Sequence, residues 1–130
     1  MAEYIASLPM SVFVLDYDHN APNPEHLNKT HYRFYEIIRK AQPDLPIIMV
    51  SMPDTDRNPA DADERRGIIM NTYLRARAEG DRKVWFVDGR TLFGGRDRDC
   101  CTMDGCHPND LGFYRMAEGL LPAIREALGM

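Results

Sequence analysis

The sequence predicts an α/β fold. Three short runs of apolar residues, at residues 11–16, 46–51 and 84–88, lie far apart in the chain. None of them alternates apolar with polar residues, which is typical of strands buried on both faces of a parallel sheet. A longer segment with helical periodicity follows each run. Strands that alternate with helices indicate crossover connections and a parallel sheet covered by helices on both faces.

The first long helix is predicted over residues 24–42, and Pro43 ends it. Its apolar and aromatic positions recur every three or four residues, as they do on the buried face of an amphipathic helix. These positions are Leu27, His31, Phe34, Tyr35, Ile38 and Ala41. A shorter helix-like segment that contains Ser7 precedes the first strand.

Two further helices follow the second and third strands. One is predicted over residues 60–80, with Gly80 just after its C-terminal end. The other begins near Asn109, and we expect Pro122 to kink or restart it, because proline lacks an N–H and clashes with the preceding turn. The expected buried positions are Ile68, Ile69, Tyr73, Leu74 and Ala76 in the first, and Leu111, Tyr114, Met116, Ala117, Leu120 and Leu121 in the second.

Composition indicates one ordinary domain over residues 1–130, with 44% hydrophobic residues for a modest core. The net charge of -4 mixes both signs along the chain, so we expect no nucleic-acid partner. The N-terminus lacks the pattern of a signal peptide, and no stretch has the apolar length of a membrane span, so we expect a soluble chain. Three clustered cysteines fit no disulfide framework, which leaves the cellular compartment open.

Polar clusters follow two of the predicted strands, at the carboxyl ends where open α/β sheets bind ligands. The segment DYDHNAP follows the first strand, and DGCHP precedes the last helix. In the second segment, Asp104 and His107 lie three residues apart, so the carboxylate can accept a hydrogen bond from Nδ1 and leave Nε2 free to act as a base. A surface contact or a helix N-cap is the alternative interpretation of this pair.

The string DGCHPNDLGFYRMA resembles the last conserved block of the SGNH, or GDSL-type, ester hydrolase family, D-x-x-H-P-x-x-x-G-x-x-x-M-A. Similarity to a branch of this family continues through FVLDYDHNAP and PIIMVSMPD, and so covers nearly the whole chain. The resemblance implies a flavodoxin-like, three-layer parallel sheet and acyl transfer from an ester without a cofactor. All the fixed positions of the block are present: Asp104, His107, Pro108, Gly112, Met116 and Ala117.

The resemblance also implies a role for Asn20. In the family, an asparagine after the third strand donates to the oxyanion within a G-x-N-D block. Asn20 fits that position, although Asp18 replaces the glycine and Ala21 replaces the aspartate. From the residues alone, an asparagine in a loop after a strand is equally typical of a turn, so both interpretations stay open.

The family's G-D-S block with its nucleophilic serine, and its block with a glycine donor, would lie upstream of the first strand. Neither is in the sequence, and the serines present, Ser7, Ser11 and Ser51, lie outside any such motif, so we assign no nucleophile. The resemblance therefore maps the chain onto the third to fifth strands of a five-stranded sheet, the C-terminal half of the family's fold. For such a truncated sheet we expect a homo-oligomer or a complementing N-terminal half.

Two patterns that suggest metal binding fail on inspection. Residues 54–65 begin like an EF-hand loop, but Pro59 replaces the required glycine and Arg65 the bidentate glutamate, so we expect a solvated loop. The cluster of Cys100, Cys101, Cys106 and His107 matches no regular zinc spacing, and we assign no metal ligand. In an exported protein, Cys101 and Cys106 could instead form a disulfide.

The sequence thus predicts a serine-type ester hydrolase that acts on small acyl groups such as acetyl. A carbohydrate carrier for that acyl group rests on family analogy alone. The alternative is a non-catalytic half-domain that binds partners, or one that needs a complementing N-terminal half.

Overall fold

The computed structural model describes residues 1–130 and contains one parallel sheet of three strands. The strands are β1 (Phe13–Leu15), β2 (Ile47–Val50) and β3 (Val84–Val87), and β2 lies in the centre. The predicted α/β fold and parallel pairing are confirmed. Each strand is shorter than its apolar run in the sequence, because the polar residue at the end of each run belongs to the following loop.

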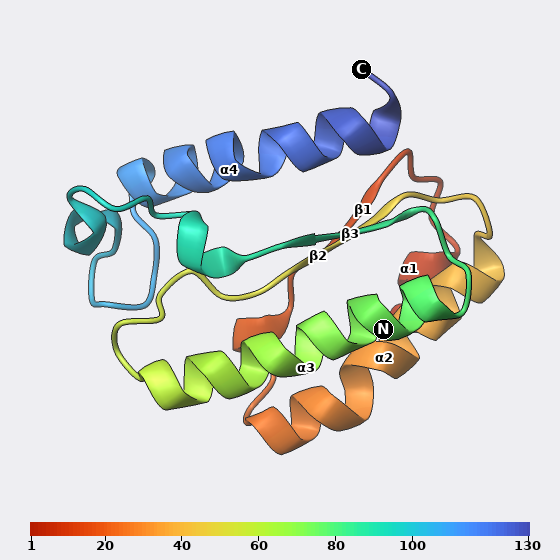
Figure 1. Cartoon of the computed structure of the whole chain (residues 1–130), viewed down its shortest axis with the longest axis horizontal. Helices are drawn as coiled ribbons and strands as arrows, with labels where there is room; N and C mark the ends of the chain where they lie inside the picture. Colours follow the sequence, from red (N-terminus) through yellow and green to blue (C-terminus); the bar gives the residue numbers. More distant parts are fainter.

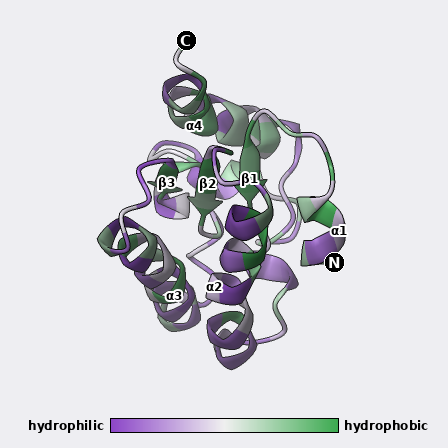
Figure 2. Cartoon of the chain, turned by 90° about the vertical axis from the view of Figure 1, so that its right-hand side faces the viewer, coloured by the Kyte–Doolittle hydropathy of each residue, from purple (hydrophilic) through white to green (hydrophobic).

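Helices cover both faces of the sheet, as Figure 1 shows. Helices α2 (Pro24–Ala41) and α3 (Pro59–Ala78) lie together on one face, and α4 (Asp110–Leu128) lies on the other. The short helix α1 (Ala2–Ala6) packs against α2. Viewed along the strands in Figure 2, the apolar sheet lies between the two helical layers, and the outer sides of α2 and α3 are largely hydrophilic. Three short 3-10 helices lie in the loops: η1 (Asp18–Asn20), η2 (Gly89–Thr91) and η3 (Arg98–Cys101).

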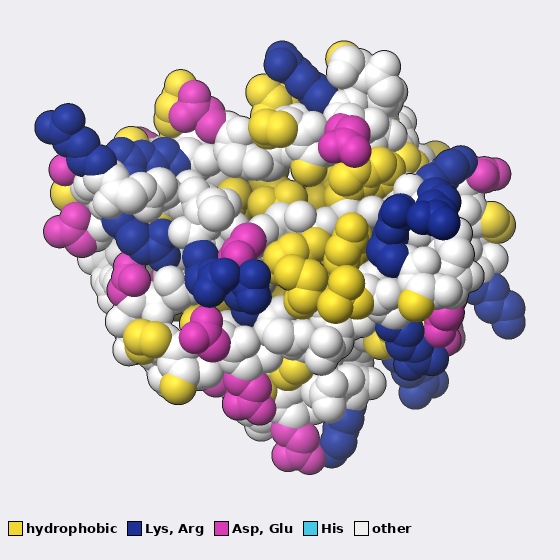
Figure 3. Space-filling model, in the orientation of Figure 1, with side chains coloured by type: hydrophobic (Ala, Val, Ile, Leu, Met, Phe, Trp, Pro, Cys, Tyr) yellow, Lys and Arg dark blue, Asp and Glu magenta, His cyan; other side chains and the backbone are white.

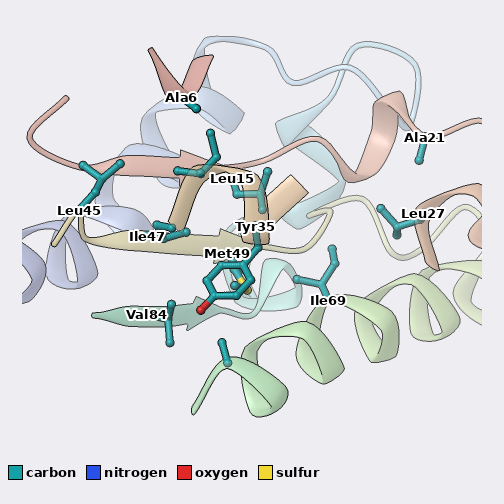
Figure 4. Packing of buried hydrophobic residues seen from close by; sticks show 12 residues of the cluster. Ala6, Leu15, Ala21, Leu27, Tyr35, Leu45, Ile47, Met49, Ile69 and Val84 are labelled. Atoms are coloured by element: carbon teal, nitrogen blue, oxygen red, sulfur yellow. The ribbon is translucent and has the colours of Figure 1, made fainter. Parts of the chain in front are cut away.

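The strands direct alternate side chains toward the two layers, as the pleat requires. Leu15, Ile47 and Met49 belong to the larger cluster with α1, α2 and α3, and Figure 4 shows them converging on Tyr35 of α2. The intervening side chains of β2 belong to a smaller cluster under α4. The sheet is therefore buried on both faces, which explains why its strands read as continuous apolar runs.

Helix α2 agrees closely with its predicted apolar face. Four of the expected positions, Leu27, His31, Tyr35 and Ile38, are buried. The Asn23 side chain caps the helix by accepting the His26 N–H at 2.8 Å.

Helix α3 departs from its predicted face. Leu74 is 53% exposed, although apolar periodicity predicts its burial, whereas Arg65 and Thr72 are buried. Both buried polar side chains have specific partners: Arg65 bonds Asp18, and Thr72 bonds His31. Apolar periodicity could not identify this face because part of it is polar.

Helix α4 corrects two predictions. It continues through Pro122 as one helix, so no restart occurs. Pro122 lies on the exposed side, where water can bond the carbonyl group that proline leaves free. The apolar stripe is confirmed only in part: Met116 and Leu120 pack on the sheet as predicted, whereas Leu111, Tyr114 and Leu121 are exposed.

Helix α4 makes a close contact with Leu92 at Gly119. A Cβ at Gly119 would lie 2.5 Å from Leu92 Cδ2, so a larger residue would require the Leu92 side chain to shift. The predicted stripe missed this because glycine carries no apolar signal.

Both outer strands have one edge without a strand partner, because β1 and β3 pair only with β2. Figure 3 shows apolar side chains gathered in the middle of one face, between α4 and α3. Trp85, Phe86 and Val87 of β3 are only partly buried. No helix is long and apolar enough to cross a membrane.

Candidate active site

Loops at the carboxyl ends of the strands enclose a cleft of about 440 Å³. These loops follow β1 and β2 and precede α4, so the cleft occupies the ligand-binding edge of an open α/β sheet. Asn20 and His107, predicted from separate parts of the sequence, both line it. The complete lining is Asp16, His19, Asn20, Pro53, Cys106, His107, Pro108, Phe113 and Met116.

Asp104 and His107 are in direct contact. His107 Nδ1 lies 2.7 Å from Asp104 Oδ2, while Asp104 Oδ1 accepts the backbone N–H groups of His107 at 2.8 Å and Cys106 at 3.0 Å. These hydrogen bonds hold the pKa of the Asp104 carboxyl far below its usual range. An ionised Asp104 favours the tautomer with the proton on Nδ1, which leaves Nε2 of the exposed His107 ring free to accept a proton.

The local fold of residues 102–109 follows from its sequence. Gly105 has φ 82°, a left-handed conformation that favours glycine, and its N–H donates to Thr102 Oγ1 at 3.0 Å. Thr102 and Pro108 form an antiparallel bridge that closes the loop. Asn109 then caps α4 by accepting the Gly112 N–H at 3.1 Å. The loop that carries the Asp-His pair is therefore held at both ends.

Gly112, a fixed position of the D-x-x-H-P block, has a physical explanation. A Cβ at this position would lie 2.2 Å from the Cys101 carbonyl oxygen. The first turn of α4 thus packs directly on the backbone that leads into the loop, and Asn109 Nδ2 donates to the Cys100 carbonyl at 2.8 Å beside it. Any larger residue at 112 would displace the loop from the helix.

Asn20 ends the 3-10 helix η1, and its side chain makes no hydrogen bond to the rest of the chain. Its amide is thus available to a ligand in the cleft. Asp18, two residues earlier, is fully buried, and its carboxylate accepts the Met52 N–H at 2.9 Å. Burial raises the pKa of the Asp18 carboxyl, and the hydrogen bonds from Met52 and Arg65 act in the opposite direction.

Sequence reasoning missed Arg65, which supports this loop from α3. Its Nη1 donates to the backbone carbonyls of Asp18 at 2.8 Å and Ala21 at 3.1 Å, and its Nε to Asp61 at 2.7 Å. The arginine occupies the position at which an EF-hand would need a glutamate. No local signal marks it, because its partners come from other parts of the chain.

The loop after β2 differs from the solvated loop predicted for residues 54–65. Asp54 is buried rather than solvated, and its carboxylate bonds His19 Nε2 and lies beside the Cys106 thiol. The bond to Asp54 raises the pKa of His19. Burial, with the negative charge of Asp54, raises the pKa of the Cys106 thiol. A thiol held in its protonated form is a poor nucleophile.

The remaining cysteines and the serines lie elsewhere. Cys100 is exposed, Cys101 is buried, and all three cysteines are free thiols, so Cys101 and Cys106 form no disulfide here. Ser51 is buried and its Oγ accepts the Gly89 N–H at 2.9 Å. Ser7 and Ser11 are exposed near the N-terminus, and neither lines the cleft.

Comparison with known proteins supports the predicted resemblance. A GDSL-like lipase from Bacteroides ovatus has a solved structure that is 28% identical, with a TM-score of 0.84 over 98% of this chain and 39% of its own. The fold also matches a salicylyl-acyltransferase of a tetracycline biosynthetic pathway, SsfX3, at 24% identity and a TM-score of 0.76 over 99% of this chain and 41% of its own. The chain spans about two fifths of either structure.

No curated protein matches the chain in sequence. The sequence model of one family, described as the GDSL-like lipase/acylhydrolase family, matches residues 1–125. That match covers nearly the whole chain and includes both the Asn20 loop and the Asp104–His107 block. The chain therefore belongs to the GDSL-like lipase/acylhydrolase family.

Proposed function

We propose that this chain supplies the base and one oxyanion donor of a serine-type ester hydrolase. One observation carries the proposal: the Asp104–His107 hydrogen bond leaves Nε2 free on a ring that lines the same cleft as the unpaired amide of Asn20. A general base and an oxyanion donor at one cleft are two of the requirements of serine-type acyl transfer, and the nucleophile is the third.

In this proposal the nucleophilic serine comes from an N-terminal half of the family's fold. Its hydroxyl attacks the ester carbonyl, and His107 Nε2 takes the proton and later passes it to the leaving alcohol. Asp104 holds the ring and stabilises the imidazolium that forms. Asn20 donates to the oxyanion of the tetrahedral intermediate, and water then releases the acyl group by the same steps.

The cleft favours a small acyl group. Its lining includes apolar Pro53, Phe113 and Met116 together with polar Asp16 and Asn20. The apolar residues suit a short acyl chain such as acetyl, and the polar side chains suit a hydroxylated alcohol, with an acylated carbohydrate as the candidate by family analogy.

The alternative function is a half-domain that binds a partner and does not cleave esters. The free edge of β1 favours it, because a strand without a neighbour on one side presents unpaired N–H and C=O groups. Catalysis by the chain alone separates the alternatives only in part, since we expect little turnover without the serine half.

The first test addresses the base in the chain alone. NMR of the ring nitrogens of neutral His107 is expected to show the proton on Nδ1, and Asp104→Asn should shift it toward Nε2. Exposed His26 on α2 provides the reference ring. A neutral His107 with its proton on Nε2 in the unaltered chain would contradict the assignment.

The second test measures turnover of a chromogenic acetyl ester. The chain alone should show little or none, whereas the chain complemented by a family N-terminal half with G-D-S should hydrolyse the ester. His107→Ala should nearly abolish that turnover, and His26→Ala should preserve it. Turnover by the chain alone, blocked by a serine-directed phosphonate that labels Ser7, Ser11 or Ser51, would overturn the proposal.

A further inference from the structure

Three potential metal ligands meet beside the cleft. His19 comes from the loop after β1, Asp54 from the loop after β2, and Cys106 from the loop before α4. One ligand atom from each lies within 4.8 Å of the others. Together they line a pocket of about 370 Å³, whose other lining residues are Met52, Arg57, Asn58 and Asp61.

Asp54, the buried carboxylate of this cluster, pairs with a histidine and not with an arginine or lysine. Asp18 and Asp54 are the buried carboxylates. Asp18 has the guanidinium of Arg65, but no lysine or arginine forms an ion pair with Asp54, whose side chain is only 5% exposed. Burial of a carboxylate is costly without a cation or a metal. Here its neighbours are an imidazole and a thiol.

We propose that His19, Asp54 and Cys106 bind a zinc ion. Imidazole nitrogen, carboxylate oxygen and thiolate sulfur are the ligand types of protein zinc sites, and sulfur disfavours magnesium and calcium. Three protein ligands leave one position for water. The site differs from the cysteine cluster in the sequence, since Cys100 and Cys101 take no part.

The ion would fasten together the two loops of the proposed active site. His19 directly precedes Asn20, and Cys106 directly precedes His107. Asp54 lies between them in the pocket wall, so metal bonds would fix the separation of the two loops. This inference rests on the cluster itself and does not depend on the esterase proposal.

The test is a titration of the full chain, freed of metal by a chelator, with zinc and with cobalt as a spectroscopic substitute. We expect one zinc per chain by calorimetry, and a thiolate-to-metal charge-transfer band with cobalt. Cys106→Ser should remove that band and weaken zinc binding by more than about 100-fold, beyond the loss typical of an outer-shell change. Asp54→Asn should weaken zinc binding in the same way.

Cys100→Ser is the matched control, because this exposed thiol lies near Cys106 in sequence but outside the cluster. It should bind zinc as the unaltered chain does. His107→Ala should also retain zinc. Loss of zinc binding in this variant would place the ion at the Cys106–His107 pair instead. Failure of the unaltered chain to bind one zinc, or a cobalt complex without a thiolate band, would overturn the proposal whether or not the variants fold.

Discussion

A buried histidine makes the stability of this chain depend on pH. The side chain of His31 on α2 faces Thr72 of α3 and is buried, with the residue only 1% exposed. Its Nδ1 bonds Thr72 Oγ1 at 2.9 Å, and the Thr72 hydroxyl donates its own proton to the Ile68 carbonyl. This arrangement favours the ring proton on Nδ1, while Nε2 is buried without a partner. A second proton at Nε2 would have no acceptor.

Burial accordingly lowers the pKa of His31 from 6.5 to about 4. Between these two values the unfolded chain binds a proton that the folded chain does not, so stability falls as the pH decreases from 6.5 toward 4. The full loss is about 3 kcal/mol, and about 2 kcal/mol is lost by pH 5. Above pH 6.5, the titration of His31 does not change the free energy of unfolding.

Urea unfolding at pH 7.5 and pH 5 measures the effect. His31→Phe keeps an aromatic ring beside Tyr17, whose ring centroid is 6.0 Å from that of His31, and removes the titration. Between the two pH values, the free energy of unfolding of this variant should fall by about 2 kcal/mol less than that of the unaltered chain. His26→Phe on the exposed side of the same helix is the control and should behave as the unaltered chain. Identical pH dependence in the unaltered chain and His31→Phe would refute the reasoning.

Three further predictions follow from the site and the sheet. In the complemented enzyme, Asn20→Ala should lower kcat by about 10²–10³, as for one lost oxyanion donor, and an unchanged kcat would remove Asn20 from the site. Gly112→Ala should lower the free energy of unfolding by about 1–3 kcal/mol, because the added Cβ clashes with the Cys101 carbonyl. At Gly67 a Cβ meets nothing within 4 Å, so Gly67→Ala should raise the free energy of unfolding by about 0.5–1 kcal/mol. Equal urea midpoints for the two variants would contradict this. The open edge of β1 should make the chain associate, and light scattering that finds a concentration-independent 14.9 kDa monomer with cooperative unfolding would rule this out.

The sequence predicts those features that depend on residues close together in the chain. The Asp104–His107 contact forms within four residues, and its hydrogen bonds belong to one tight loop. The buried face of α2 follows from apolar spacing, because its buried positions recur every three or four residues and most of them are apolar or aromatic. Apolar runs likewise identify the strands, since burial on both faces leaves no room for polar side chains.

Features that depend on contacts between distant segments escape such prediction. Arg65 looks like a surface residue of α3 until Asp18 and Ala21 are placed against it. The packing of α4 includes glycine contacts with Leu92 and with the backbone of Cys101, and glycine adds nothing to an apolar stripe. Asp54 belongs to an acidic segment that the sequence predicts to be a solvated loop. Only the fold brings His19 and Cys106 next to it.

With Asn20 in its proposed role, the chain departs from the family's G-x-N-D block on both sides of that residue. Asp18 stands in place of the glycine, and its buried carboxylate accepts a hydrogen bond from the Met52 N–H in the loop after β2. Ala21, in place of the aspartate, is buried, and its carbonyl accepts from Arg65 of α3. The residues on both sides of Asn20 are thus anchored to two neighbouring elements. Asn20 can be held toward the cleft without the motif's own glycine and aspartate, because buried hydrogen bonds from Arg65 and Met52 fix the backbone of its loop.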